Sequence, residues 1–260
     1  MNAKSIDLGL TGYDELFMTD RERAESHLPR IQDIPLTEID DFPDHPFHVR
    51  LDADMDELVQ SVKERGIITP ITLRQKEDGR YEIVSGHRRR KACELAGLDT
   101  VKAEVKDLSR DEAIILMVES NLQRTTILPS EKAFAYKMRL EAMNRQGQRT
   151  DLTSDPLGQK LKGKYSVEIL AEGTSDSKTQ VQRFIRLTNL LPDLLSKVDE
   201  GKIAMRPAVE ISYLAETEQQ SLLDSIESED STPSYAQALK MRRFSQEGNL
   251  TDEVILSIME

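Results

Sequence analysis

The sequence has few cysteines and aromatic residues and lacks any long apolar run. Its single cysteine, Cys93, excludes a disulfide within the chain and is typical of a reducing compartment. Tryptophan is absent, and six Phe and six Tyr are too few for wide aromatic platforms that stack single-stranded nucleic acid. No apolar run approaches the ~20 residues that cross a bilayer, and the N-terminus lacks a secretory-signal pattern. We therefore expect a cytoplasmic protein with no membrane contact.

Charge is unevenly distributed along this acidic chain. The formal net charge is −12, and residues 1–60 hold 15 acidic against 5 basic residues. Residues 210–230 contain seven acidic and no basic residues. In contrast, residues 159–190 contain six basic and three acidic residues, so the middle of the chain is locally basic. Because phosphate contacts depend on local charge, the overall acidity does not exclude a DNA-binding protein.

The length and patterning of the chain predict more than one domain. A chain of 260 residues exceeds one average domain, and 32% charged residues are typical of a soluble globular protein. We expect a flexible tail over 1–30, an α+β domain over 31–128, an all-α domain over 129–230 and C-terminal helices over 231–260. Within the tail, Asp14–Phe17 is a candidate docking peptide, although a mobile tail explains the pattern as well.

Short apolar runs in 31–128 predict a small mixed sheet. The strand-like runs are residues 34–36, 70–73, 81–84 and 101–105. The turn residues Glu77–Gly79 lie between the second and third of these runs and predict a hairpin.

Helical spacing and capping residues alternate with these strands. The residues that share one helical face are Met55, Leu58, Val59 and Val62. We expect this helix to have Asp54 as its N-cap and Gly66 as its stop. A second helix should end at Gly97, and residues 109–112 have the spacing of a capping box that starts a third.

Beyond Pro129 the pattern changes to helices. Ser130 is the expected cap of a helix over 130–143, and residues 144–165 are polar and predict a loop. A short helix over 167–171, a turn with glycine and a helix capped by Ser177 then have the helix-turn-helix layout. Such layouts are also common without DNA binding. The further expected helices are 192–200, 206–215, 234–244 and 251–259.

The start of the second helix of this layout would face the base edges of DNA. The candidate DNA-binding residues there are Ser177, Lys178, Thr179, Gln180 and Arg183. The helices at 192–200 and 206–215 would cover the apolar side of the motif.

A basic string, Gly86–Lys91, lies between a strand-like run and a helix-like run. The first N–H groups of a helix have no partners within it, and the helix dipole favours negative charge there. Arginine adds a planar fork of donors that matches phosphate oxygens. Since the chain as a whole is acidic, this string favours an anion-binding turn. A solvated basic helix end would give the same pattern.

A second unusual string, Glu119–Arg124, follows further along the chain. Its Asn and Gln carry oxygens that can face a metal or a ribose, and Arg124 adds another fork for phosphate. Together the two strings predict a nucleoside triphosphate site without a P-loop. For this string the alternative is an ordinary polar helix C-terminus.

Three other patterns are weaker candidates for a site. Gly158–Tyr165 nearly matches a P-loop, but Tyr165 stands where a Ser or Thr should hold Mg²⁺ and no strand precedes it. A basic loop beside DNA is the simpler interpretation. His45 and His48 have no further ligand near in sequence, which disfavours zinc. Cys93 lies among apolar residues and predicts a core thiol.

The order of these strings resembles that of ParB-type (ParB/RepB) partition proteins. The strings are Ser85–Arg90, Asn121–Arg124 with the following Leu128–Ala133, and the helix-turn-helix pattern at 166–188. His45–Arg50 resembles the first box of that family, and Gly66–Ile71 continues it. Each string alone is short, but their order and spacing over residues 30–215 fit the family.

This resemblance implies an N-terminal CTP-binding domain, a helix-turn-helix domain that reads a palindromic centromere-like site in double-stranded DNA, and a C-terminal dimerisation domain. CTP with Mg²⁺ would close the homodimer into a clamp that slides along DNA during plasmid or chromosome partition. A Walker-type partition ATPase would dock on an N-terminal peptide. The protein would then be cytoplasmic and nucleoid-associated.

The resemblance also assigns roles to residues. The implied nucleotide-binding residues are Thr69, Pro70, Ser85, Gly86, His87, Arg88, Arg89, Arg90, Asn121, Gln123 and Arg124. Of these, Gly86, Arg88 and Arg89 would cradle the triphosphate, and Thr69–Pro70 would face the base. Asn121 would coordinate the metal.

Two positions depart from the family pattern. His87 and Ser120 stand where the family usually has glutamate, and Glu119 lies one step before the second position. One step turns a side chain by about 100° on a helix, so Glu119 does not simply substitute. The resemblance therefore implies at most weak CTP hydrolysis, with no catalytic residue assigned. No dimerisation domain is evident after residue 215, where two short helices are expected.

Two alternative functions remain open at this point. One is a DNA-binding transcriptional regulator that has no nucleotide response and binds its site equally with and without CTP. The other is a ParB-fold enzyme, either a small-molecule kinase or a nuclease. The DNA-reading helix argues against the kinase, and metal-dependent DNA cutting would identify the nuclease.

Overall fold

The computed structural model describes residues 31–124, 126–150 and 167–259, and its first half is built on one five-stranded sheet. The strands are β1 (Ile31–Pro35), β2 (Ile39–Asp40), β3 (Ile71–Gln75), β4 (Tyr81–Ser85) and β5 (Thr100–Lys106). Their order is β1-β5-β3-β4-β2. The β1/β5 and β3/β4 pairs are antiparallel, whereas β5/β3 and β4/β2 are parallel. The predicted mixed sheet and its hairpin are confirmed.

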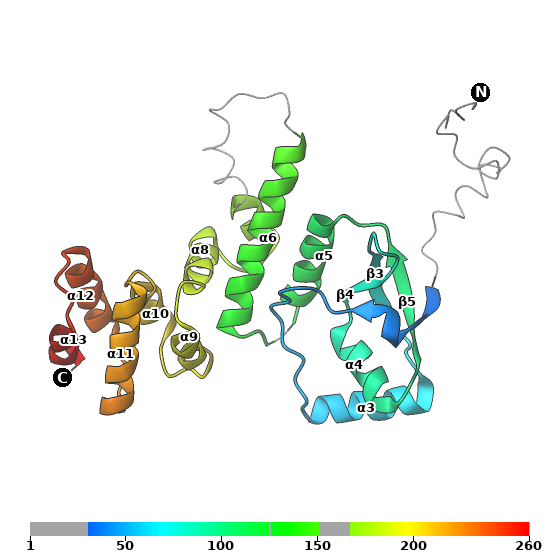
Figure 1. Ribbon diagram of the computed structural model, residues 1–260, viewed down its shortest axis with the longest axis horizontal. Helices are drawn as coiled ribbons and strands as arrows, with labels where there is room; N and C mark the ends of the chain where they lie inside the picture. Colours follow the sequence, from blue (N-terminus) through cyan, green and yellow to red (C-terminus); the bar gives the residue numbers. More distant parts are fainter. Residues whose placement is uncertain (1–30, 125, 151–166, 260) are drawn as a thin grey trace, which may run out of the picture.

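Helices cover both faces of this sheet (Figure 1). On one face, α3 (Ala53–Arg65) and α4 (His87–Ala96) share a buried cluster with Ile83 of β4. On the other face, α5 (Arg110–Leu122) shares a second cluster with the next strand residue, Val84. Because successive strand side chains point to opposite faces, β4 contributes to both cores. Strand β4 therefore joins the two cores of the domain, and the basic string follows directly from its end.

Local capping signals set the helix ends, with one correction. Gly97 has a φ of 77° and ends α4, and the capping box at residues 109–112 starts α5, both as predicted. Asp54 is not the N-cap of α3. Instead Asp52 is the cap, and its side chain accepts a hydrogen bond from the N–H of Met55. Asp52 has the extended backbone that a cap residue requires, whereas Asp54 already lies in the first helical turn.

A long helix, α6 (Pro129–Thr150), connects the two halves of the chain (Figure 1). Its length corrects the prediction of a loop from residue 144, since the Arg and Gln residues there are good helix formers. Ser130 is not its cap, because the helix already begins at Pro129. The Ser130 hydroxyl instead donates a hydrogen bond to Asp199 Oδ2 at 2.5 Å.

A short helix, a turn and a second helix follow, in the order that the sequence predicts. Residues 167–172 are helical, residues 173–176 form the turn, and α8 (Lys178–Leu187) begins after Ser177. The Ser177 hydroxyl accepts a hydrogen bond from the N–H of Gln180, which confirms the expected cap.

Five helices complete the described chain. They are α9 (Pro192–Asp199), α10 (Met205–Ile211), α11 (Glu216–Glu229), α12 (Tyr235–Gln246) and α13 (Asp252–Met259). One buried cluster contains residues from Leu187 to Met259, on both sides of residue 230. The expectation of two helices after residue 215 is wrong, because α11 precedes the other two. Its many acidic and polar residues conceal the apolar positions Leu222, Leu223 and Ile226 in the sequence pattern.

The architecture confirms the predicted fold class, an α+β domain with a mixed sheet followed by an all-α region. Among the described helices, none is both long enough and apolar enough to cross a membrane. The tail 1–30 and the P-loop-like string 158–165 lie outside the described residues.

Candidate functional site

Gly86 forms the turn between β4 and α4. Its φ of 102° lies in the left-handed region, and a Cβ atom added there would lie 2.7 Å from Ile71 Cγ2. Glycine therefore lets the turn approach β3 closely. No side chain caps α4 at Gly86, so the first N–H groups of the helix lack the partner that a Ser or Asp cap would provide. This end of α4 is suited to an anion.

Arg89 joins the basic string to the loop before β3. Its Nη1 donates hydrogen bonds to the carbonyl oxygens of Thr69 and Pro70 at 2.6 and 2.5 Å. Burial lowers the pKa of the Arg89 guanidinium. The structure thus brings Thr69 and Pro70 beside the basic string.

The neighbouring arginines are held by carboxylates from other segments. Arg88 Nη2 lies 3.0 Å from Asp52 Oδ1, the residue that caps α3. Arg90 is paired with Asp41, which follows β2. Each arginine of the string therefore already has a protein partner.

The end of α5 positions the second string. Asn121 is buried, and its Nδ2 donates a hydrogen bond to the carbonyl oxygen of Met117 at 2.8 Å. The Ser120 hydroxyl donates to the same oxygen at 2.9 Å. Gln123 is exposed at the C-cap position. The amide of Asn121 is therefore fixed by the helix, and its oxygen is the atom left for a ligand.

Arg124 brings the two strings together. Its guanidinium lies 5.6 Å from the centroid of the Phe47 ring. Burial lowers the pKa of Arg124, and the positive charge of Arg88 lowers it further, against the opposite effect of Glu131. The charges of the two strings therefore act on one another, and Glu131 offsets part of the positive charge.

His87, the first residue of α4, stacks on His45. The ring centroids are 3.8 Å apart, with an angle of 36° between the ring planes. The Nε2 atoms of both rings are buried and have no hydrogen-bond partner among the described residues. Burial lowers the pKa of His87 to about 2 and that of His45 to about 4, with nearby Arg124 acting in the same direction. Both imidazoles are therefore neutral at pH 7.

The five candidate DNA-binding residues lie at the start of α8 but differ in exposure. Thr179 and Arg183 are exposed, whereas Gln180 is half-buried. Ser177 uses its hydroxyl as the helix cap. Lys178 Nζ lies 2.5 Å from Glu168 Oε1 on the preceding helix, so this cation is already paired. Thr179 and Arg183 are the two that present free side chains to a ligand.

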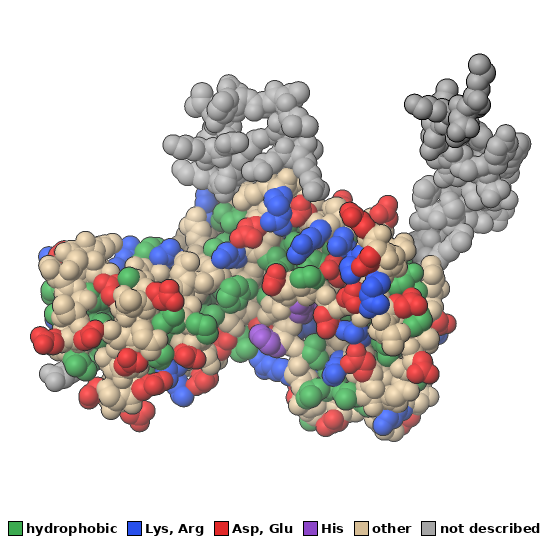
Figure 2. Space-filling view, in the orientation of Figure 1, with side chains coloured by type: hydrophobic (Ala, Val, Ile, Leu, Met, Phe, Trp, Pro, Cys, Tyr) green, Lys and Arg blue, Asp and Glu red, His purple; other side chains and the backbone are tan. Residues whose placement is uncertain are grey.

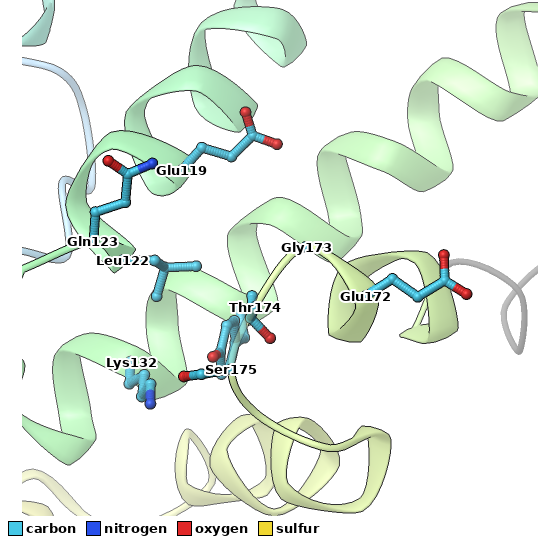
Figure 3. Close-up of a pocket in the computed structure, with 9 residues that line it drawn as sticks. Glu119, Leu122, Gln123, Lys132, Glu172, Gly173, Thr174 and Ser175 are labelled. Carbon is cyan, nitrogen blue, oxygen red and sulfur yellow. The ribbon is translucent and has the colours of Figure 1, made fainter.

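A pocket of about 460 Å³ separates the end of α5 from the turn before α8 (Figure 3). Its lining residues are Glu119, Leu122, Gln123, Lys132, Tyr136, Glu172, Gly173, Thr174 and Ser175. The Tyr136 hydroxyl donates to Asp176 Oδ2 at 2.5 Å, and Lys132 Nζ lies 2.6 Å from the same oxygen. These contacts fix the turn to α6.

One helical turn further along the same side of α6, Arg139 contacts the second string. Its Nη2 lies 2.6 Å from Glu119 Oε1, and its side chain is almost fully buried. A Cβ atom added at Gly173 would lie 3.3 Å from Arg139 Nη2, so the turn packs directly on this guanidinium. Arg139 therefore touches both the end of α5 and the turn that leads to α8.

Sequence reasoning missed several residues of this site. Asp41, Asp52 and Arg139 hold the basic groups or join the two regions. His45 was weighed as a zinc ligand and placed in the first box, but its stacking on His87 was not predicted from the sequence. The position of His45 in the first box was the one feature of the sequence that indicated a role in the site. No local pattern indicated such a role for Asp41, Asp52 or Arg139.

Comparisons with known proteins point to one family. Residues 20–122 match the model of the ParB N-terminal domain. The chain is 32% identical over 170 residues to the chromosome-partitioning protein Spo0J of Thermus thermophilus, covering 65% of this chain and 55% of that protein. It is 35% identical over 147 residues to a nucleoid occlusion protein of Bacillus mycoides, covering 56% and 48%. The chain thus spans about half the length of these relatives.

One solved structure shows the same fold at low sequence identity. A Pnob8-like ParB-N domain superposes with a TM-score of 0.50 at 15% identity, covering 89% of this chain and 98% of that one. The family model, the curated relatives and this fold agree with the order of motifs in the sequence. Residues 20–122 therefore carry a ParB N-terminal domain, and the chain is similar to ParB-type partition proteins over about half of their length.

Proposed function

We propose that this protein binds a specific DNA site and that CTP gates its hold on DNA, as a sliding clamp in plasmid or chromosome partition. The observation that carries the proposal is the arrangement of two regions around α6. The uncapped start of α4 lies beside Arg124, and Arg139 joins the end of α5 to the turn before α8. The chromosome-partitioning and nucleoid occlusion relatives support a role on DNA.

The residues at the start of α4 fit a triphosphate. The Nε2 atoms of His45 and His87 and the Nε of Arg90 are buried without partners among the described residues. A phosphate would reach these buried atoms only after neighbouring side chains shift, but its oxygens would accept hydrogen bonds from the uncapped first N–H groups of α4 and offset the positive charges of Arg88 and Arg124. An anion at this place therefore satisfies groups that the protein alone leaves unsatisfied.

The same residues do not fit a magnesium ion held by the protein. The described residues contain no group of three His, Cys, Asp or Glu side chains arranged for a metal. Near the second string, Glu119 is paired with Arg139, and the oxygen of Asn121 is the one candidate ligand. Mg²⁺ prefers phosphate and carboxylate oxygens. We therefore assign no hydrolytic step to this site.

Helix α6 couples the nucleotide to DNA in this proposal. A nucleotide that binds the start of α4 and the end of α5 would favour one position of the Glu119 side chain. Because Glu119 is paired with Arg139, it would also favour one position of Arg139. Arg139 packs under Gly173, so the turn and α8 would respond to the same change. Both ligands then bias one equilibrium between open and closed states, and each strengthens the binding of the other.

The DNA and protein partners follow from the same proposal. Thr179 and Arg183 would contact base edges in the major groove. A homodimer would match a palindromic site, because the symmetry of the protein then equals that of the DNA. A Walker-type partition ATPase is the proposed protein partner, and the nucleoid in the cytoplasm is the proposed location.

Calorimetric titration with CTP, ATP, GTP and UTP, each with and without matched DNA, tests the nucleotide gate. We expect CTP to bind most tightly and matched DNA to strengthen its binding. Crosslinking of the purified dimer through an introduced Lys137→Cys on the exposed side of α6 reports closure, because the single native cysteine is buried. Equal binding of all four nucleotides would remove CTP from the proposal.

A DNA-binding regulator without a nucleotide response is the second candidate. It is favoured by the carboxylate and carbonyl partners that Arg88, Arg89 and Arg90 already have. If these contacts are permanent, the arginines are structural. Matched-DNA affinity that stays constant at saturating concentrations of each nucleotide would support this candidate against the first.

A further inference from the structure

Tyr213 lies under two arginines from different helices. The Cζ of Arg186, on α8, is 4.0 Å from the centroid of its ring, and the Cζ of Arg242, on α12, is 3.6 Å from it. Tyr213 itself follows α10 and is exposed. Three separate elements thus build one group, which we call the Arg–Tyr–Arg platform.

The platform is held rigidly but is not neutralised. Arg186 Nη2 donates a hydrogen bond to the carbonyl oxygen of Ser212 at 2.7 Å. Arg242 Nη1 donates to Glu210 Oε2, also at 2.7 Å. Glu210 is the one carboxylate paired with either guanidinium among the described residues, so the two cations share a single negative charge. A fixed pair of arginines with excess positive charge suits an anion, because little side-chain freedom is lost on binding.

The platform continues the exposed face of α8. Thr179, Arg183 and Arg186 are spaced at i, i+4 and i+7, so they follow one stripe along the helix. The first two are the free residues at the proposed DNA-reading end. Arg186 extends this stripe away from that end, towards Tyr213 and α12.

Charge over the helical half is separated in the same direction. In Figure 2, Lys and Arg side chains gather along the upper edge, over α8, α10 and α12, and Asp and Glu predominate along the lower edge, over α9 and α11. On α12, Lys240 and Arg243 are further exposed cations. A long polyanion on α8 would therefore be attracted along the upper edge and repelled from the lower one.

We propose that Arg186, Tyr213 and Arg242 contact the phosphate backbone of DNA and lengthen its contact from α8 to α12. This inference rests on the proposed DNA binding and adds a surface outside the helix-turn-helix. Guanidinium and phenol groups bind phosphates without reading sequence. The platform would thus strengthen binding to matched and unrelated DNA alike, while Thr179 and Arg183 provide the preference.

The salt dependence of DNA affinity tests this role. Each phosphate contact adds about 0.9 to the slope of log K against log salt concentration. We expect Arg242→Gln in the full chain to lower that slope by about 0.9 and to weaken matched and unrelated duplexes by the same factor. Arg65→Gln, an exposed charge at the end of α3, is the matched control and should keep the wild-type slope.

Two further variants separate the proposal from a purely structural role. Glu210→Gln removes the carboxylate that offsets the platform, so DNA binding should become tighter, opposite to the effect of Arg242→Gln. Arg186→Gln, on another helix, should reproduce the loss of slope if Arg242→Gln fails to fold. An unchanged slope in both arginine variants would overturn the inference, and so would weaker binding in Glu210→Gln.

The outcome also distinguishes this inference from the proposed function. If the wild-type chain binds no DNA at low salt, the proposed function fails together with the platform. If the wild type prefers matched DNA and Arg242→Gln binds with the same slope, the platform alone fails. Binding of an acidic peptide instead of DNA at these arginines would give that second result.

Discussion

The Arg139 guanidinium lies 2.6 Å from the Glu119 carboxylate, and this pair joins the middle of α6 to the last turn of α5. The arginine side chain is 6% exposed, whereas that of the glutamate is 47% exposed. The Nε and Nη1 atoms of Arg139 have no partner among the described residues. Among those residues, Glu119 is therefore the one carboxylate that offsets the buried charge of Arg139.

Loss of this carboxylate should destabilise the protein. We expect Glu119→Gln to lower the free energy of unfolding by about 1–3 kcal/mol, between the values for exposed and for fully buried pairs. Urea denaturation measures the change. Glu247→Gln is the matched control, since it removes the partner of exposed Arg243 and should cost less than about 1 kcal/mol. Equal losses in the two variants would show that Arg139 does not depend on Glu119.

A methyl group at Gly86 should be tolerated much less than one at Gly97. Both glycines have positive φ, but an added Cβ at Gly86 meets Ile71 Cγ2 at 2.7 Å and one at Gly97 meets nothing within 4 Å. We expect Gly97→Ala to cost about 1 kcal/mol from backbone strain and Gly86→Ala about 2–4 kcal/mol from strain plus the clash. Thermal or urea unfolding compares them. Similar costs would mean that the turn can shift away from β3.

Arg89 should be required for nucleotide binding. We expect Arg89→Ala to weaken CTP binding by at least about tenfold, which corresponds to ~1.4 kcal/mol. The fold should remain, at a cost of about 1 kcal/mol for the hydrogen bonds to the carbonyls of Thr69 and Pro70. Calorimetry and circular dichroism measure the two effects. Lys91→Ala, on the same helix and paired with Glu94, should bind CTP as the wild type does. A normal affinity in Arg89→Ala would refute the site.

The stacked histidines should make stability depend on pH. Burial lowers the pKa of His87 to about 2 and that of His45 to about 4, below the ordinary 6.5. Between these folded values and pH 6.5, the unfolded chain therefore binds more protons than the folded protein. Stability due to these groups is therefore complete above pH 6.5 and is lost as pH falls towards the folded values. Each histidine should contribute a slope of about 1.4 kcal/mol per pH unit below its unfolded pKa.

Urea unfolding of the wild type and of His87→Gln between pH 5 and 6.5 measures that slope. This window lies above the ordinary pKa of carboxylates, which limits their contribution. In the variant, the slope of the free energy of unfolding against pH should be smaller by the contribution of one histidine, at most about 1.4 kcal/mol per pH unit. An identical slope in the two proteins would mean that His87 is accessible to protons in the folded state.

Two cations at the start of α8 should differ in their importance for DNA. Arg183 is exposed, whereas Lys178 is paired with Glu168 at 2.5 Å. We expect Arg183→Ala to weaken matched DNA by about 1–3 kcal/mol more than unrelated DNA. Lys178→Ala should change the preference little. Fluorescence anisotropy with both duplexes measures the difference, and the opposite ranking would place the base contacts elsewhere on the helix.

Local patterns predicted most of the fold because strands, turns and caps depend on neighbours in sequence. The hairpin of β3 and β4, the Gly97 stop and the Ser177 cap are examples. The prediction was wrong for α11 and for the end of α6, where polar residues concealed helices. In α11, tertiary packing of a few apolar residues supports the helix rather than a clear periodic pattern, whereas the end of α6 is supported by the helix propensity of its Arg and Gln residues.

The candidate site was less predictable because its contacts join distant segments. The partners of Arg88 and Arg90 lie 36 and 49 residues earlier in the sequence. Nothing in the local pattern indicated that Asp52 would both cap α3 and contact Arg88. The residue types of the basic string indicated an anion, but its present partners follow only from the folded chain.

Three residues within a single turn of α6 belong to three different buried clusters. Ala133 lies in the cluster of the C-terminal helices, Ala135 in that of α5, and Tyr136 in that of α8. A rotation of α6 about its own axis would expose at least one of these side chains to water. A shift of the helix by one residue would move all three out of their clusters. Any large rearrangement should therefore carry α6 as a rigid body together with one set of neighbours, so that it parts from the other set along a whole interface.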